Sequence, residues 1–326
     1  MQKQARRQPE RRYLHMQGSS VIHKKRSRVL HKIALSRYLY LFLLPSLMYL
    51  VIFHYMPIYG VQIAFKRFMP TKGIWDSPWV GVANFRRFFS SYYFERVLAN
   101  TIKLSLYNLI AGFPFPVIMA LLFNEIRSAK MKKLVQTVSY VPHFISVIVL
   151  VGMVNLFFGQ TTGLINTVRR NMGLETIGFL NEPKYFASMY VWSGIWQHAG
   201  WNAIIYIAAL SGIDPELHEA AQIDGASRLK RIWYINLPGI LPTVIIMFIL
   251  DAGKIMSLGF EKIYLMQNTM NISASQVIST FVYESGMLDM DYGFASAVDL
   301  FNNVVNIALL LLVNQLARRV SQTSLF

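Results

Sequence analysis

Six apolar stretches, each about 20 residues or longer, follow one another along this chain. A run of that length is what a helix needs to cross the hydrocarbon core of a bilayer. Inside the bilayer the backbone must satisfy its own hydrogen bonds, so each stretch predicts a helix. The sequence therefore predicts an all-α polytopic membrane protein with six transmembrane helices, at residues 38–60, 101–123, 138–158, 185–210, 239–260 and 297–316.

The composition agrees with membrane insertion. The chain is 54% hydrophobic, which is too apolar for an ordinary soluble domain. Its net charge of +16 could suggest nucleic acid binding, but the basic residues concentrate beside the apolar stretches and no nucleic-acid-binding motif accompanies them. The absence of cysteine excludes a disulfide framework and a thiolate metal site.

The basic residues also predict the orientation. Twenty lie in the tail 1–37, the link between the second and third stretches, the segment between the fourth and fifth, and the C-terminus. Only ten lie in the alternate segments, although six of these are in residues 61–100. Because cytoplasmic loops carry the excess of Lys and Arg, we expect both termini in the cytoplasm. Residues 1–37 are then a basic cytoplasmic tail, and 38–326 form the six-span domain.

A polar, basic segment, residues 212–238, separates the fourth and fifth stretches. Asp214 can cap a helix whose first turn accommodates Pro215, and Gly225 can end that helix in the left-handed conformation. Ser227 can cap a second short helix, and we expect Pro238 to stop it where the fifth stretch begins. The prediction is two short helices joined at a glycine elbow.

The same segment resembles the EAA signature of permease subunits from bacterial ATP-driven importers. The matching positions are Glu219, Ala220, Ala221, Gly225, Ile235, Leu237 and Pro238. The resemblance implies the fold of a type I ABC importer permease, with this segment as a coupling loop that inserts into a cleft on the ATP-binding subunit. That coupling role falls on Glu219, Ala220, Ala221, Asp224 and Gly225.

Weaker elements are similar to the carbohydrate-type permeases, within the oligosaccharide and polysaccharide class that includes the alginate importer. They are Trp79–Phe85 after the first stretch, Asn100–Thr101 opening the second, and Gly163–Asn166 after the third. The resemblance implies import by alternating access across the bacterial cytoplasmic (inner) membrane. It also implies a second permease subunit in a heterodimer, two ATP-binding subunits and an extracytoplasmic solute-binding protein.

ATP hydrolysis is expected in another subunit. The sequence has no phosphate-binding loop of the G-x-x-x-x-G-K-[ST] type, and no catalytic constellation is apparent. We therefore expect a transport subunit rather than an enzyme, with no cofactor bound by this chain and with ATP and Mg used by the partner ATPase.

Polar residues within membrane helices are candidates for a substrate pathway. The candidates are Trp192, Trp196, His198 and Trp201 in the fourth stretch, and Asp251 and Lys254 in the fifth. Aromatic faces suit the C–H surfaces of sugars, although such aromatics can equally be interfacial or core residues. Asp251 and Lys254, three residues apart, can form an intrahelical ion pair. Alternatively, Lys254 lines a cavity and meets a carboxylated sugar.

Other interpretations stay open. An ATP-independent channel or ion-coupled carrier would leave the coupling loop without a role, and a neutral oligosaccharide is the alternative to an acidic, alginate-like one. The side chains of Asp299, Asn302, Asn303 and Asn306 in the sixth stretch are expected to form hydrogen bonds between helices. His143, beside Pro142, is expected to be structural.

Overall fold

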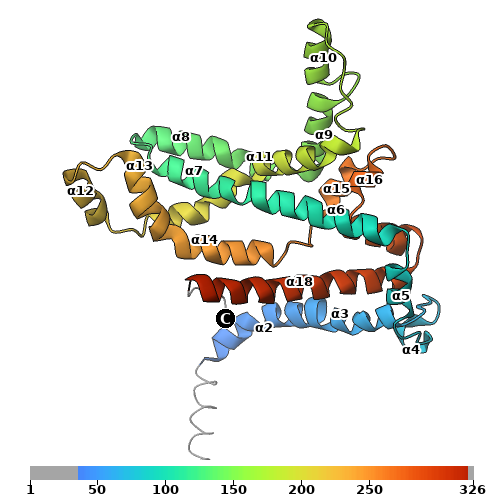
Figure 1. The fold of residues 1–326 in the computed structure, drawn as a ribbon. Helices are drawn as coiled ribbons and strands as arrows, with labels where there is room; N and C mark the ends of the chain where they lie inside the picture. Colours follow the sequence, from blue (N-terminus) through green and yellow to red (C-terminus); the bar gives the residue numbers. More distant parts are fainter. Residues whose placement is uncertain (1–35, 322–326) are drawn as a thin grey trace, which may run out of the picture. The chain divides into compact units, whose positions relative to one another are not determined.

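The computed structural model describes residues 36–321, and these are helical with short connecting loops (Figure 1). Within this range the only extended pairings are two isolated bridges, Lys66 with Trp79 and Met69 with Gly73. The all-α prediction is therefore confirmed. The basic tail predicted at 1–37 lies almost entirely outside the described residues. The chain forms two compact units, with the division between Val61 and Gln62.

The first unit is a single apolar rod. It contains α2 (Arg37–Leu50), the π-helical turn η1 (Val51–Tyr55) and α3 (Met56–Ile58), and the 3₁₀ segment η2 (Tyr59–Phe65) leads out of it. Pro45 lies inside α2, and Pro57 follows the wider π turn. The most apolar window of this rod has no buried residue. Such a surface requires lipid or another helix around it.

The second unit begins with a loop carrying two short helices, α4 (Gly73–Asp76) and α5 (Ala83–Phe89). The Asn84 amide ties this loop together by donating to the carbonyls of Ala64 (2.9 Å) and Lys66 (3.1 Å). A long rod follows, made of α6 (Tyr93–Tyr107), the π turn η3 (Asn108–Gly112) and α7 (Pro114–Asn124). Pro114 stands where the π turn ends, so its missing N–H does not break the rod.

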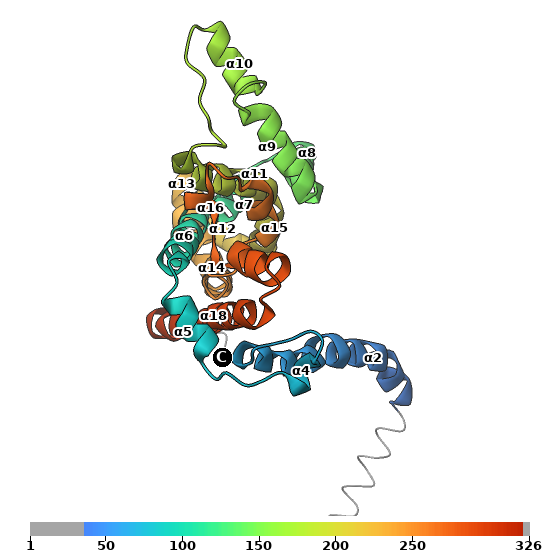
Figure 2. The ribbon, with the colours of Figure 1, turned by 90° about the vertical axis from the view of Figure 1, so that its right-hand side faces the viewer.

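The third predicted span, 138–158, is not continuous. α8 (Ala129–Tyr140) ends in the 3₁₀ turn η4 (Val141–Phe144), and α9 (Val147–Phe158) begins at an angle of 100° to it. Pro142 disfavours continuation of the helix, and the hydroxyl of Ser146 accepts from Val149 N (3.3 Å) to cap the new one. α9 packs on α11 and α15 through its buried Val151 and Val154, and α10 (Leu164–Asn171) follows it as a projecting arm (Figure 2).

The centre of this unit is α11 (Pro183–Leu210), which packs against α7, α8, α14 and α16. α8 and α11 approach closely at Gly200, where an added Cβ would lie 2.1 Å from the Ser139 carbonyl oxygen. α11 matches the fourth predicted span, 185–210. Its polar residues lower its mean hydropathy, however, so α11 is not among the helices that are apolar enough to span a membrane by hydropathy alone.

The C-terminal half contains α12 (Pro215–Ile223), α13 (Arg228–Arg231), the π turn η5 (Ile232–Asn236) and α14 (Leu237–Ala252). After a non-helical stretch come α15 (Phe260–Met266), α16 (Ile272–Ser275), α17 (Ile278–Tyr283), the π turn η6 (Glu284–Leu288) and α18 (Tyr292–Ser321). α18 packs along α14, α17 and α5. Phe88 of α5 is fully buried there, among Phe281, Phe294 and Val298.

The predicted fifth span, 239–260, ends eight residues early, at Ala252. A turn follows, and α18 holds it: Asn306 Oδ1 accepts from Met256 N (3.0 Å), and Asn306 Nδ2 donates to Ser257 Oγ (2.9 Å). Asn306 therefore bonds a loop rather than another helix.

Four helices are long and apolar enough to cross a membrane, and the bent pair of α8 and α9 could supply a fifth. The six-span count is therefore not reproduced by length and hydropathy in the described residues.

Candidate functional site

The segment 212–238 forms two capped helices, as predicted. Asp214 Oδ1 accepts from Glu216 N (2.9 Å) at the start of α12, where Pro215 occupies the first turn. The helix ends in a left-handed turn at Gly225 (φ +71°), with Ala226 N donating to the Ala221 carbonyl (2.8 Å). Ser227 Oγ accepts from Lys230 N (3.4 Å) and caps α13. The local signals in the sequence are sufficient to build this elbow.

The prediction that Pro238 stops the second helix is wrong. α13, η5 and α14 form one continuous helix, Arg228–Ala252. The π turn at Ile232–Asn236 widens the helix just before Pro238, which then occupies the first turn of α14. Because a proline in a first turn lacks only an N–H that needs no partner there, the helix continues. The second short helix, α13, is thus continuous with α14, and α12 is joined to it through the elbow at Gly225.

The residues given a coupling role lie on the surface of the elbow. Glu219, Ala220, Asp224 and Gly225 are exposed and Ala221 is half-buried. Beside them, Ile223 is 87% exposed, and Leu217 and Leu229 are also exposed. Sequence reasoning missed these apolar side chains, although their place on short helices between two spans was a usable signal. Small residues flanked by exposed apolar ones form a surface suited to a protein partner.

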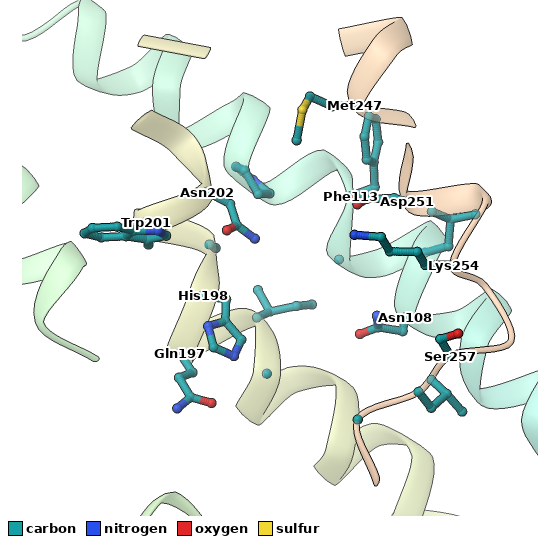
Figure 3. Close-up of a pocket in the computed structure, with 18 of the residues that line it drawn as sticks. Asn108, Phe113, Gln197, His198, Trp201, Asn202, Met247, Asp251, Lys254 and Ser257 are labelled. Atoms are coloured by element: carbon teal, nitrogen blue, oxygen red, sulfur yellow. The ribbon is translucent and has the colours of Figure 1, made fainter. Parts of the chain in front are cut away.

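A cavity of about 960 Å³ lies between α11, the α6–α7 rod, the end of α14 and the residues that follow it. Polar side chains from each of these elements line it (Figure 3). Four of the six predicted pathway residues are among the lining: His198, Trp201, Asp251 and Lys254. The fold thus places side chains from the fourth and fifth predicted spans around one cavity.

Trp192 and Trp196 are not part of the cavity lining. Trp192 Nε1 donates to the Tyr107 hydroxyl (3.0 Å), and its ring meets Phe115 edge-on. This contact ties α11 to the α6–α7 rod, while the Trp192 side chain stays 48% exposed. Trp196 is half-exposed on α11.

Asp251 and Lys254 do not form the expected helical ion pair. α14 ends at Ala252, so Lys254 lies in the turn beyond it, where its backbone N donates to the Asp251 carbonyl (3.1 Å) and its charge acts on the Asp251 carboxylate from more than 4 Å. Among residues 36–321 the ion pairs within 4 Å are Arg87–Asp291 and Lys184–Glu182. Lys254 extends its amine into the cavity, toward Asn202 and His198 (Figure 3).

An aromatic cluster forms the cavity wall at the break between α8 and α9. The His143 ring stacks on Trp201 with 4.5 Å between centroids and an interplanar angle of 1°. His143 Nδ1 also lies 3.1 Å from His198 Nδ1. His143 therefore positions two lining residues, which agrees with the structural role expected for it.

Other lining residues were not predicted as site residues. Asn108 comes from the π turn η3, Ser257 from the turn after α14, and Glu261 and Lys262 from α15. Their positions depend on where α14 ends and how the chain returns toward α11, which local sequence patterns do not encode. Within residues 36–321, no group of three or more His, Asp and Glu side chains is arranged to hold a metal ion.

The comparisons with known proteins agree with this architecture. A model of the family described as "Binding-protein-dependent transport system inner membrane component" matches residues 112–322. The protein LplB of Bacillus subtilis (strain 168) is 43% identical over 290 residues, which are 89% of this chain and 91% of LplB. The polygalacturonan/rhamnogalacturonan transport system permease protein YteP of the same strain is 39% identical, covering 93% of this chain and 94% of YteP.

A solved structure is similar over nearly the whole fold. A chain of a bacterial ABC transporter that imports the acidic polysaccharide alginate superimposes with a TM-score of 0.83 at 38% identity, covering 90% of this chain and 99% of that chain. A second structure contains that alginate transporter with a periplasmic protein bound to an alginate pentasaccharide. The predicted resemblance is confirmed: this chain belongs to the family of inner membrane components of binding-protein-dependent transport systems, as a permease of the sugar and oligosaccharide importer class.

Proposed function

We propose that this permease moves acidic oligosaccharides through the cavity beside α11 by alternating access, driven by ATP hydrolysis in a separate subunit. The observation that carries the proposal is Lys254, whose amine extends into the cavity with no ion pair within 4 Å among residues 36–321, although the Asp251 carboxylate acts on it from further away. A lysine at the centre of a bilayer costs about 2.5–3.5 kcal/mol on insertion scales unless it is paired or meets water. A carboxylate-bearing substrate gives this charge a partner.

The relatives support an acidic substrate. The importer with the similar fold carries the acidic polysaccharide alginate, and YteP belongs to a polygalacturonan/rhamnogalacturonan system. Alginate and polygalacturonan both carry a carboxylate on their sugar rings, which a lysine amine can bind by charge-assisted hydrogen bonds. The aromatic face of Trp201 and the amide of Asn202 add contacts suited to the rest of a sugar. A neutral oligosaccharide is the alternative substrate.

The proposed assembly has α12 docked in a cleft of an ATP-binding subunit on the cytoplasmic side. Exposed Glu219 would meet a cation there, while Ala220 and Ala221 allow the partner to approach the helix backbone. The continuous helix from α13 into α14 gives a rigid path from this surface to Asp251 at the cavity. A second permease subunit, a second ATP-binding subunit and an extracytoplasmic solute-binding protein complete the complex.

The test is uptake by the whole complex in proteoliposomes. One substrate is a galacturonic acid tetrasaccharide, and the other is its methyl ester, which has the same shape without the charge. Lys254→Met should lower ATP-dependent uptake of the acid about tenfold, corresponding to about 1.4 kcal/mol, and affect the ester much less. Lys103→Met is the matched control, because Lys103 is an exposed lysine of α6 outside the cavity lining.

Each outcome of this experiment has a clear meaning. Uptake that requires ATP and the ATPase excludes the channel or ion-coupled carrier. If the wild-type complex transports the methyl ester as well as the acid, the substrate is a neutral oligosaccharide. Equal loss of both substrates in Lys254→Met, with reduced co-purification of the complex, would make Lys254 a structural residue.

A further inference from the structure

Lys262 is a buried cation in the wall of the same cavity. Its side chain starts from α15 and reaches α11, where Nζ donates to the Tyr190 carbonyl (2.8 Å) and lies 4.7 Å from the centre of the Tyr190 ring. Only 8% of the residue is exposed. Gly194 makes room for it, since a Cβ at that position would lie 3.1 Å from Nζ. Tyr190, Gly194 and Lys262 all line the cavity.

The described residues offer this amine fewer hydrogen-bond acceptors than it has N–H donors. An ammonium group has three donors, and the described residues supply one hydrogen-bond acceptor, the Tyr190 carbonyl, together with the face of its ring. No carboxylate in residues 36–321 lies within 4 Å of Nζ, although Glu261 is its neighbour in sequence. An ammonium taken out of water without a counter-ion costs several kcal/mol, whereas a Met of similar size would fill this position without that cost.

We propose that Lys262 is an anion-binding residue of the cavity, which together with Lys254 receives carboxylate groups of the passing oligosaccharide. The inference rests on the proposed function, because it assumes a substrate that carries negative charge. The two lysines differ in their exposure to solvent and in the elements that surround them. Lys254 extends from an exposed turn, whereas Lys262 of α15 is buried against α11 beside Gly194, which lies one helical turn before His198. Lys262 is therefore the residue that discriminates between charged and neutral sugars.

The surroundings of Lys262 also predict a pH dependence. α15 lies outside the candidate spans, and burial lowers the pKa of the Lys262 amine to about 7. The titratable and charged groups around it are Tyr190 and His198 of α11, Tyr283 of α17, and Asp251, Lys254 and Glu261 of the cavity wall; α9 carries none. The amine is charged below this pKa, and only the charged form attracts a carboxylate. Binding through Lys262 is therefore strongest below about pH 7 and weakens about tenfold per pH unit above it.

The experiment uses the reconstituted complex with the same two substrates. In Lys262→Met, the ratio of acid to ester uptake should fall about tenfold, chiefly through a higher KM for the acid. In the wild type, KM for the acid should rise between about pH 7 and pH 8, while in Lys262→Arg it should stay flat, since arginine keeps its charge. Lys184→Met is the control, because Lys184 lies outside the cavity lining and pairs with Glu182.

A purely structural Lys262 would behave differently. If it only tethers α15 to α11, Lys262→Met lowers uptake of acid and ester together and leaves their ratio unchanged, which overturns the inference while the proposed function stands. A pH profile that is identical in the wild type and Lys262→Arg overturns it as well. If the wild-type complex does not prefer the acid, the proposed acidic substrate fails first, and the role of Lys262 fails with it.

Discussion

At the scale of single residues, the proposed coupling surface makes few contacts with the rest of this subunit. Glu219 is exposed on α12, and no described residue forms an ion pair with it. Its neighbours Ala220 and Ala221 contribute little bulk. Replacing Glu219 therefore removes no contact within residues 36–321 on which folding depends. A change at this position therefore tests the proposed contact with a partner protein rather than the stability of the permease.

Glu219→Lys should weaken docking of the ATP-binding subunit while the permease still inserts. A charge-assisted contact becomes a like-charge repulsion, and disrupting such a buried contact costs about 2–5 kcal/mol. Co-purification of the ATPase and substrate-stimulated ATP hydrolysis measure the effect. Glu175→Lys, an equally exposed carboxylate after the α10 arm, should change neither. Normal docking and hydrolysis in Glu219→Lys would remove this residue from the coupling surface.

At the scale of elements, the sequence predicts what is local and misses what depends on distant contacts. Asp214, Gly225 and Ser227 build their caps from neighbouring residues, so the elbow could be predicted correctly. The prediction that a helix stops at Pro238 was wrong, because this proline follows a π turn and the helix continues past it. No pattern of apolar residues predicts such a turn.

The residues that line the cavity also fall into those that local sequence patterns predict and those that they do not. His198, Trp201, Asp251 and Lys254 were found because they are polar or aromatic residues inside apolar stretches. Lys262 was not found, because its place in the cavity requires α14 to end at Ala252. The chain beyond that end is held by Asn306, which lies 50 residues further along than Met256. That contact is a property of the fold rather than of the local sequence.

The crossing of α8 and α11 gives a test of this packing. In Gly200→Ala, the new Cβ would lie 2.1 Å from the Ser139 carbonyl oxygen, so the two helices must separate. We expect a loss of about 1–3 kcal/mol, seen as a lower unfolding temperature in detergent. Gly152→Ala in α9 is the matched control, since nothing lies within 4 Å of its added Cβ. There alanine should only favour the helix. Equal thermal stability of the two variants would contradict the close crossing.

At the scale of the whole molecule, the proposed function requires a particular orientation in the membrane. ATP is cytoplasmic, so α12 can couple to an ATPase only from that side. The excess of Lys and Arg in the segments that share a side with α12 favours this arrangement. The loop 61–100 holds six basic residues on the opposite side, and it is where the charge rule is weakest. A direct measurement of sidedness is therefore more informative than further counting of charges.

The chain contains no cysteine, so a single introduced thiol reports its own position. Thr71 and Gln222 are both exposed, the first in the loop before α4 and the second on α12. A membrane-impermeant maleimide added to intact spheroplasts should label Thr71→Cys. It should label Gln222→Cys only after permeabilisation, and the parent chain not at all. A reporter fused after Phe326 should give a cytoplasmic signal. Labelling of Gln222→Cys from outside would place α12 away from ATP, which would invalidate the coupling mechanism even though the family assignment would stand.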